Sequence, residues 1–292
     1  MLCLNNEWQG CESPELERGA RRLAREVFGD AQYLDLGPSD CGSLGVRDGV
    51  FALDSVTDRF RRTLGELRGA APERIFTAGG TCGSEAAPVA YLASRRPGLG
   101  VVWFDAHGDL NTPATSPSGH FHGMVLRMLM GDGPLALCGE IAHSLDPARV
   151  VLAGVRDLDA AEREYAGSAG LHLIEGWPKD AVERILKSLG SVGVTCVYIH
   201  VDVDVFDPAS YGDALFSVPG GRRTRGCVDL RASSSGMAGG CDTGDLPCVL
   251  CDRRDANAWA WEQWRRLEVP VPCRARGHAT CDCCDQYLPI RV

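Results

Sequence analysis

Apolar residues in the first three quarters of the chain form two kinds of pattern. Apolar positions at helical spacing predict helices over 15–29, 48–69, 85–96, 121–131, 157–167 and 179–190. Short, continuously apolar runs predict strands over 31–37, 74–80, 101–107, 149–156, 171–175 and 195–206. Strands of this kind are buried on both faces, and here they alternate with helices. The sequence therefore predicts a three-layer α/β/α fold with a parallel sheet.

This pattern stops near Gly221. The remaining 71 residues contain eight of the chain's 14 cysteines, and Leu, Ile, Val and Phe together make up only 11 of the 71. That share lies below the roughly 20% at which a packed core becomes hard to build. We therefore divide the chain into an α/β domain, 1–221, and an atypical Cys/Arg-rich tail, 222–292.

Charge and cysteine content exclude several classes of protein. The chain has 39 acidic and 30 basic residues, a net charge of −9, which argues against a general nucleic-acid or membrane-surface binder. We see neither an apolar run of about 18 residues nor a secretory signal, and we expect a cytoplasmic location. There the cysteines are reduced, and serve as packing residues, metal ligands or nucleophiles.

Two clusters of titratable residues follow the most apolar strands. They are Asp105, His107 and Asp109 after the run VVWF, and His200, Asp202 and Asp204 within TCVYIHVDVDVF. Alternate residues of an extended strand share a face, so we expect His200, Asp202 and Asp204 to point the same way. Crowded carboxylates stay ionised only when a cation compensates their charge. A pair of divalent ions fits, whereas a single Asp after a strand is more often a turn or cap residue.

Together with these clusters, further segments resemble the ureohydrolase family of arginases, agmatinases and formimidoylglutamases. In the family's order and spacing, the matching segments are GGTCGSE (79–85), DAHGDLNTP (105–113), SGHFHGM (118–124), VRDLD (155–159) and DVDVFDP (202–208). The resemblance covers roughly residues 5–221 and is closest to the arginase branch. It implies an arginase-like α/β fold, a small-molecule guanidino or amidino substrate, and assembly into homotrimers or hexamers.

The resemblance also implies a set of metal ligands. Asp105 and Asp202 would bridge two manganese ions. Asp109 would bind one of these ions, and His107 and Asp204 would bind the other.

Four further residues match the family's catalytic and substrate-binding positions. His122 matches a histidine that transfers protons. Asn111 and Ser118 match residues that hold the carboxylate of an amino-acid substrate, and Asp159 matches the residue that meets its α-amino group. Without the resemblance, His122 would be a packed histidine at a helix start, Asn111 a turn residue, Ser118 a loop residue and Asp159 a helix cap.

The segment at 79–85 departs from the family pattern. Cys82 stands where the family usually has a histidine ligand, and Thr81 replaces an aspartate. Three interpretations are open: Cys82 is a ligand in a variant site, one metal is bound weakly, or Cys82 is a buried core cysteine. A thiolate ligand would favour Zn or Fe over Mn.

The tail departs further, because the family continues there with a helix, a glutamate-bearing strand and a closing helix. We hypothesise that residues 222–292 are read in a shifted frame or otherwise replaced, and that the last sheet elements are missing or disordered. The rival interpretation is a small zinc module with ligands drawn from Cys248, Cys251, His278, Cys281, Cys283 and Cys284.

The residues and the resemblance together predict a binuclear-metal hydrolase. A guanidinium carbon is a poor electrophile, and a metal pair lowers the pKa of water enough to attack it near pH 7. The predicted reaction cleaves a C–N bond of an arginine-like compound and releases urea. Two alternatives remain: a catalytically impaired, metal-binding relative, and a formimidoylglutamase-like hydrolase.

Overall fold

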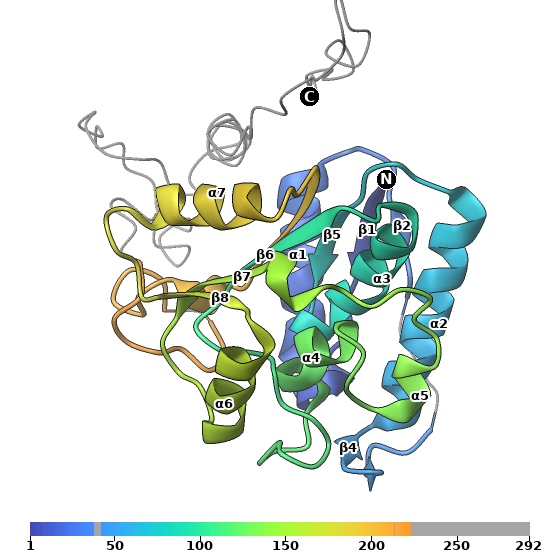
Figure 1. The fold of residues 1–292 in the computed structure, drawn as a ribbon. Helices are drawn as coiled ribbons and strands as arrows, with labels where there is room; N and C mark the ends of the chain where they lie inside the picture. The colour runs from blue at the N-terminus through green and yellow to red at the C-terminus, as the bar shows by residue number, and fades with distance from the viewer. Residues whose placement is uncertain (38–41, 213, 223–292) are drawn as a thin grey trace, which may run out of the picture.

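The computed structural model describes residues 1–37, 42–212 and 214–222, shown in colour in Figure 1. The hypotheses on the tail, namely a shifted frame, disorder and a zinc module at 248–284, concern residues outside this description. In the part of the chain that is described, no helix combines the length and the apolar character needed to cross a bilayer.

Strands and helices alternate along the chain as predicted. The strands are β1 (Leu2–Asn5), β2 (Leu34–Asp35), β3 (Val46–Arg47), β4 (Val50–Phe51), β5 (Phe76–Gly79), β6 (Leu99–Phe104), β7 (Val150–Val155), β8 (His172–Glu175) and β9 (Cys196–Val201). The α-helices are α1 (Glu15–Phe28), α2 (Leu53–Ala70), α3 (Ala86–Arg95), α4 (Val125–Leu129), α5 (Leu135–Cys138), α6 (Ala160–Ala169) and α7 (Ala181–Ser191). Short 3₁₀ turns are η1 (Gln9–Cys11), η2 (Cys82–Glu85), η3 (Phe121–Met124), η4 (Pro147–Arg149) and η5 (Val203–Val205).

Two predicted helices differ in detail from the structure. The helix expected over 48–69 starts only at Leu53, because β3 and β4 form a short antiparallel pair before it and Ala52 adopts a left-handed conformation. The helix expected over 121–131 is a 3₁₀ turn followed by the short helix α4. Strand β1 was not predicted, since its four residues end in a polar asparagine.

The parallel strands form two sheets in the described chain, ordered β2-β1-β5 and β8-β7-β6-β9. β5 pairs only with β1, and β9 pairs only with β6, among the strands described. The predicted sheet is therefore parallel throughout but lies in two parts. Because neighbouring parallel strands end at the same edge, the carboxyl ends of β6 and β9 lie side by side.

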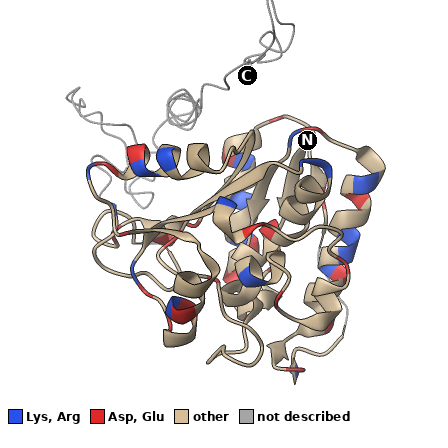
Figure 2. Cartoon of the chain, in the orientation of Figure 1, with Lys and Arg blue, Asp and Glu red and all other residues tan. Residues whose placement is uncertain are grey.

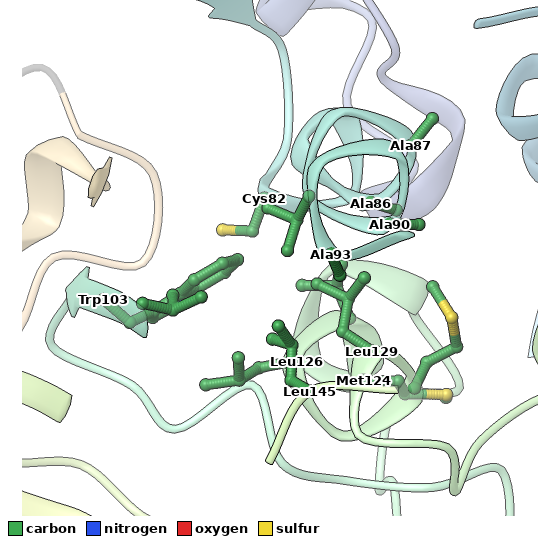
Figure 3. Close-up of a cluster of buried hydrophobic side chains, with 14 of the residues drawn as sticks. Cys82, Ala86, Ala87, Ala90, Ala93, Trp103, Met124, Leu126, Leu129 and Leu145 are labelled. Carbon is green, nitrogen blue, oxygen red and sulfur yellow. The ribbon is translucent and has the colours of Figure 1, made fainter. Parts of the chain in front are cut away.

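Helices cover both faces of these sheets, which confirms the predicted α/β fold (Figure 1). Helix α7 packs on one face of β6 and β7 through Ile185 and Leu189, and α1 packs on β1 and β5 through Ala20 and Ala24. The largest core lies on the other face, where α2, α3 and α4 meet. Figure 3 shows alanines of α3 facing leucines of α4 there, with Trp103 at the border of the cluster.

Glu85 is a buried carboxyl directly before α3 and makes stability depend on pH. Its Oε2 has no hydrogen-bond partner among the described residues, and burial raises its pKa from the ordinary 4.5 to about 8. Between these two pH values the Glu85 carboxyl is protonated in the folded protein and ionised in the unfolded chain. The stability contributed by the neutral carboxyl is complete below about pH 4.5 and is lost as the pH rises through 8.

We expect Glu85→Gln to be neutral at pH 4.5 and to stabilise the protein at pH 8. The gain should be at most about 4 kcal/mol, because one pKa unit corresponds to about 1.4 kcal/mol. Urea unfolding at both pH values measures it, with Glu66→Gln, an exposed carboxyl of α2, as the control. Equal stabilisation at both pH values would contradict the assignment of a neutral, buried Glu85.

Candidate metal centre

Side chains that can bind metal gather at the carboxyl ends of β5, β6 and β9. Figure 2 shows acidic positions near the centre of the molecule as well as on the outer helices. Three groups have their ligand atoms within 4.8 Å of one another: Cys82, Asp105, His200 and Asp202; Cys82, Asp109 and His122; and Asp105, His107 and Asp204. Every predicted metal ligand belongs to at least one group, and Cys82 and Asp105 each belong to two.

The turn after β5 positions Cys82. Gly80 lies so close to the backbone of Glu7 that a Cβ atom would overlap the Glu7 carbonyl oxygen. The hydroxyl of Thr81 donates to the Glu7 carboxylate and accepts from the Gly83 amide at 3.1 Å. These bonds hold the turn so that the Cys82 sulfur points away from the alanines of α3 (Figure 3).

The Cys82 thiol borders the core and also reaches the carboxylates. Its side chain is buried, and Sγ lies 3.1 Å from Asp202 Oδ2 and 4.0 Å from Asp105 Oδ2. Burial, followed by the charges of Asp109 and Asp202, raises the pKa of the thiol well above its usual value of 9.0. The sulfur is therefore placed as a ligand would be, inside a group of oxygen donors.

The segment after β6 adopts a tight loop that directs both of its aspartates inward. Asp105 Oδ1 accepts the backbone amide of His107 at 2.7 Å. Asp109 has a left-handed backbone (φ 54°), and its carbonyl accepts the amides of Leu126 and Arg127 at the start of α4. An aspartate tolerates this conformation better than most side chains. These bonds hold Asp109 among the possible metal ligands at the carboxyl end of β6.

The aspartates after β9 are placed by a turn rather than by strand alternation. The strand ends at Val201, and Asp202 caps η5 by accepting the Asp204 amide at 2.9 Å. The prediction that Asp204 shares a strand face with His200 and Asp202 was therefore wrong. Asp204 still reaches the site, since its Oδ1 accepts the Ala106 amide at 3.0 Å.

Burial, followed by mutual repulsion, raises the pKa values of three of these carboxyl groups. Burial and the charges of Asp204 and Asp105 raise the pKa of Asp202 to about 7. Burial and Asp105 raise the pKa of Asp204 to about 6 and that of Asp109 well above 3.8. Carboxyl groups packed in this way need positive charge to ionise fully, which divalent cations supply.

Histidines provide part of that positive charge. Burial alone would lower the pKa of His107, but Asp105 and Asp204 outweigh it and raise the pKa to about 11. Its Nδ1 lies 2.9 Å from Asp204 Oδ2 and 3.4 Å from Asp105 Oδ1. Burial would raise the pKa of Asp105, but His107 and His200 hold it below its usual range. Oxygen, imidazole and thiol donors together suit a divalent transition metal, so the residues fit such ions.

The predicted substrate-binding residues are only partly brought together. Asn111 Nδ2 donates to Asp159 Oδ2 at 2.7 Å, and Asp159 also caps α6. Ser118 is exposed in the loop before η3, where its hydroxyl accepts the His120 amide at 3.2 Å. The helix-cap role expected for Asp159 without the resemblance is therefore present, and its carboxylate also lies beside Asn111.

His122 lies against the metal groups rather than within the core. Its ring belongs to a group with Cys82 and Asp109, and it stacks on Phe216 with ring centroids 5.3 Å apart. Burial, helped by His120, lowers its pKa to about 4. The imidazole is thus neutral at pH 7 and can accept a proton.

Two carboxylates that support the site, Glu162 and Glu7, were not predicted from the sequence. Glu162 accepts the amides of Leu110 at 2.8 Å and Asp159 at 2.9 Å, and so ties the loop after β6 to α6. Its signal was present, because Asp159 and Glu162 have the spacing of a capping box. No sequence pattern marks Glu7, because its partner Thr81 lies 74 residues away in the chain.

The α/β fold gathers carboxylates, imidazoles and a thiol at its strand ends, and these donors could hold divalent metal ions. The model of the Arginase family matches residues 12–242, and the chain therefore belongs to the arginase family. The predicted ureohydrolase resemblance is confirmed. The matched span ends 50 residues before the end of the 292-residue chain.

Individual relatives and solved structures agree with this family. The chain is 37% identical to an arginase of Staphylococcus aureus (strain COL) over 155 residues, 50% of this chain and 48% of that protein. It is 35% identical to the N(omega)-hydroxy-L-arginine amidinohydrolase of Streptomyces lavendulae over 171 residues, 55% of this chain and 58% of that protein. The match spans about half the length of these curated relatives.

Two solved arginases show the similarity of the fold. The Bacillus subtilis arginase superposes with a TM-score of 0.63 at 26% identity, covering 76% of this chain and 80% of that one. The Entamoeba histolytica arginase gives a TM-score of 0.66 at 23% identity, covering 76% of this chain and 81% of that one.

Proposed function

We propose that this protein is a binuclear-metal hydrolase that cleaves a C–N bond of a linear, arginine-like guanidino or amidino compound and releases urea. The observation that carries the proposal is the convergence of three ligand groups, of which one shares Cys82 with the second group and Asp105 with the third. The names of the relatives, arginase and N(omega)-hydroxy-L-arginine amidinohydrolase, support a substrate with a guanidino group.

For the metal ligands we keep the assignment predicted from the sequence. Asp105 and Asp202 would be shared between two ions, Asp109 would hold one ion, and His107 and Asp204 would hold the other. Cys82 would be a further ligand, so that Fe or Zn are alternatives to Mn. When bound, the two ions supply Lewis acidity, which lowers the pKa of water toward neutrality.

The remaining residues bind the substrate and move a proton. Asp159 carries the negative charge that an α-ammonium group needs, and Asn111 beside it offers an amide donor to an α-carboxylate. Ser118 offers a hydroxyl from its exposed loop to the same carboxylate. Water adds its oxygen to the guanidinium carbon, the C–N bond breaks, and the neutral ring of His122 carries the proton to the departing amine.

A cysteine in place of the family's histidine favours a second candidate, a metal-binding relative with impaired catalysis. A formimidoylglutamase-like activity is a further alternative within the same chemistry. The trimeric or hexameric assembly and the cytoplasmic location stay predictions from the sequence, and size-exclusion chromatography with light scattering tests the first.

Urea release by the full chain tests the proposal. The protein is loaded with Mn, Zn or Fe, its metal content is measured, and L-arginine, agmatine and guanidino acids are supplied. We expect urea from a substrate with an α-carboxylate in preference to agmatine, because Asn111, Ser118 and Asp159 address the amino-acid end. No turnover of any substrate at two bound metal equivalents would refute the proposal and favour the impaired relative.

A further inference from the structure

We propose that His200 is a metal ligand of this chain and that, with Cys82, Asp105 and Asp202, it forms a four-donor site selective for zinc over manganese. The inference rests on the proposed metal centre and revises it at one ion, where His200 takes the place given there to Asp109. Asp109 lies in a separate ligand group with Cys82 and His122. The family resemblance assigns no role to His200, which was predicted only to share a face with Asp202 and Asp204.

The surroundings of His200 leave one ring nitrogen without a partner. The side chain is buried on β9, 5% exposed, and its ring stacks on Trp103 with centroids 3.7 Å apart and planes at 21°. Its Nε2 has no hydrogen-bond partner within the described part of the chain. The nearest carboxylate oxygen, Asp105 Oδ2, is 3.8 Å away, which is too long for a hydrogen bond.

A buried imidazole nitrogen of this kind normally finds a hydrogen bond, because leaving it unpaired costs free energy. Here the nitrogen lies with the Cys82 sulfur and with oxygens of Asp105 and Asp202, all within 4.8 Å of one another. Four donor atoms at this spacing can all coordinate a single cation placed between them. A metal ion therefore satisfies His200, whereas a purely structural stacking role leaves Nε2 unpaired.

The donor set determines which ion fits. One sulfur, one imidazole and two carboxylates make a four-ligand site with a soft donor, and zinc is commonly bound by cysteine, histidine and carboxylate ligands in tetrahedral geometry. The group formed by Asp105, His107 and Asp204 has no sulfur, and it suits Mn as well as Zn. The two metal positions of this chain are thus chemically unequal.

In this arrangement His200 supplies the imidazole donor that position 82 lacks. The family usually has a histidine where Cys82 stands, and in this chain an imidazole enters the same cluster from β9 instead. The imidazole donor is relocated rather than lost. Trp103 positions the His200 ring by stacking on it, and its Nε1 donates a hydrogen bond to Asp109 Oδ2 at 3.2 Å.

Cobalt titration of the metal-free full chain tests the inference. Bound Co(II) reports a thiolate ligand by a charge-transfer band in the near ultraviolet and four-coordination by intense visible bands. Cys82→Ser should abolish the charge-transfer band. His200→Ala should weaken the visible bands and lower the affinity of one cobalt site at least about tenfold. Competition by Zn should displace that cobalt, and competition by Mn should not.

Two controls guard against a loss of fold. His172→Ala removes a partly buried imidazole of β8 that belongs to no ligand group of the described residues, and it should titrate like the parent protein. Circular dichroism of each metal-free variant shows whether it folds. The double variant Cys82→His with His200→Ala should regain tight binding of two ions and lose the preference for Zn, since it places an imidazole at position 82.

An unchanged cobalt affinity and spectrum in a folded His200→Ala variant would overturn the inference. That result is distinguishable from a failure of the proposed function. If no substrate releases urea but His200→Ala loses an ion, the ligand assignment stands without the activity. If urea is released and His200→Ala keeps both ions and the spectrum, the activity stands without the ligand assignment.

Discussion

Replacing Asp105 by asparagine should abolish tight binding of two metal ions and reduce kcat/KM for urea release at least about a hundredfold. Residues that only orient metal ligands already contribute 10–100-fold to metal affinity or activity, and a shared ligand should contribute more. Asp105 belongs to the group with Cys82 and to the group with His107 and Asp204. Its loss therefore removes a donor from both metal positions at once.

Asparagine is a suitable replacement because it keeps the shape of Asp105. The amide oxygen can still accept the His107 backbone amide, which lies 2.7 Å from Oδ1 in the parent. The charge that repels Asp109, Asp202 and Asp204 disappears. The pairing with His107 and His200, which holds the pKa of Asp105 below its usual range, is lost as well. The metal-free variant should therefore be less stable than the parent, and the increase in Tm on adding metal should be absent.

Asp157→Asn provides the matched control. This carboxylate is also close to His107, with Oδ2 4.0 Å from Nε2, but its side chain is 65% exposed and it belongs to no ligand group found among the described residues. Calorimetry with and without metal and urea assays should show parental behaviour for it. If Asp105→Asn kept two metal ions and its activity, Asp105 would not be the shared ligand.

The fold could be predicted wherever the signal was local. Continuous apolar runs such as 99–104 and 150–155 can be buried only as central strands, and both were predicted close to their observed bounds. β1 has four residues, and β3 and β4 have two each, which is too short for a pattern of apolar residues to indicate a strand. The division of the sheet into two parts depends on which strands pair, and pairing is not a local property of sequence.

The site residues that follow apolar strands could be predicted in the same way, whereas the contacts that depend on the tertiary structure could not. Acidic residues after apolar strands meet because parallel strands end at one edge, so Asp105 and Asp202 could be brought together from sequence. Asp204 was predicted in the site for the wrong geometric reason, since η5 rather than an extended strand directs it inward. The contact of Glu7 with Thr81 spans 74 residues and needs the tertiary structure.

Arg156→Ala should lower the free energy of unfolding by about 3 kcal/mol, more than any exposed ion pair could. Arg156 follows β7 and donates to backbone carbonyls of three separate segments. They are Gly154 (2.9 Å), Asp204 (2.6 Å), Val205 (3.3 Å), Phe206 (3.4 Å), Val218 (2.8 Å) and Pro219 (3.2 Å). Removing the guanidinium leaves these partly buried acceptors without their donor.

Lysine should restore only part of the lost stability. A guanidinium donates in several fixed directions, whereas an ammonium acts as a compact point charge and cannot span three segments at once. Arg163→Ala is the control, because its 2.9 Å pair with Glu175 is exposed on both sides and should be worth about 0–1 kcal/mol. Urea unfolding of the four proteins measures these differences at a single pH.

Arg156 also connects stability to the metal centre. Its shortest bond goes to the carbonyl of Asp204, the residue whose side chain meets His107 at 2.9 Å. We therefore expect Arg156→Ala to weaken metal binding at the group with His107 and Asp204 more than at the group with Cys82. If Arg156→Ala destabilised no more than Arg163→Ala, or weakened both metal positions equally, Arg156 would not be the residue that holds the Asp204 turn in place.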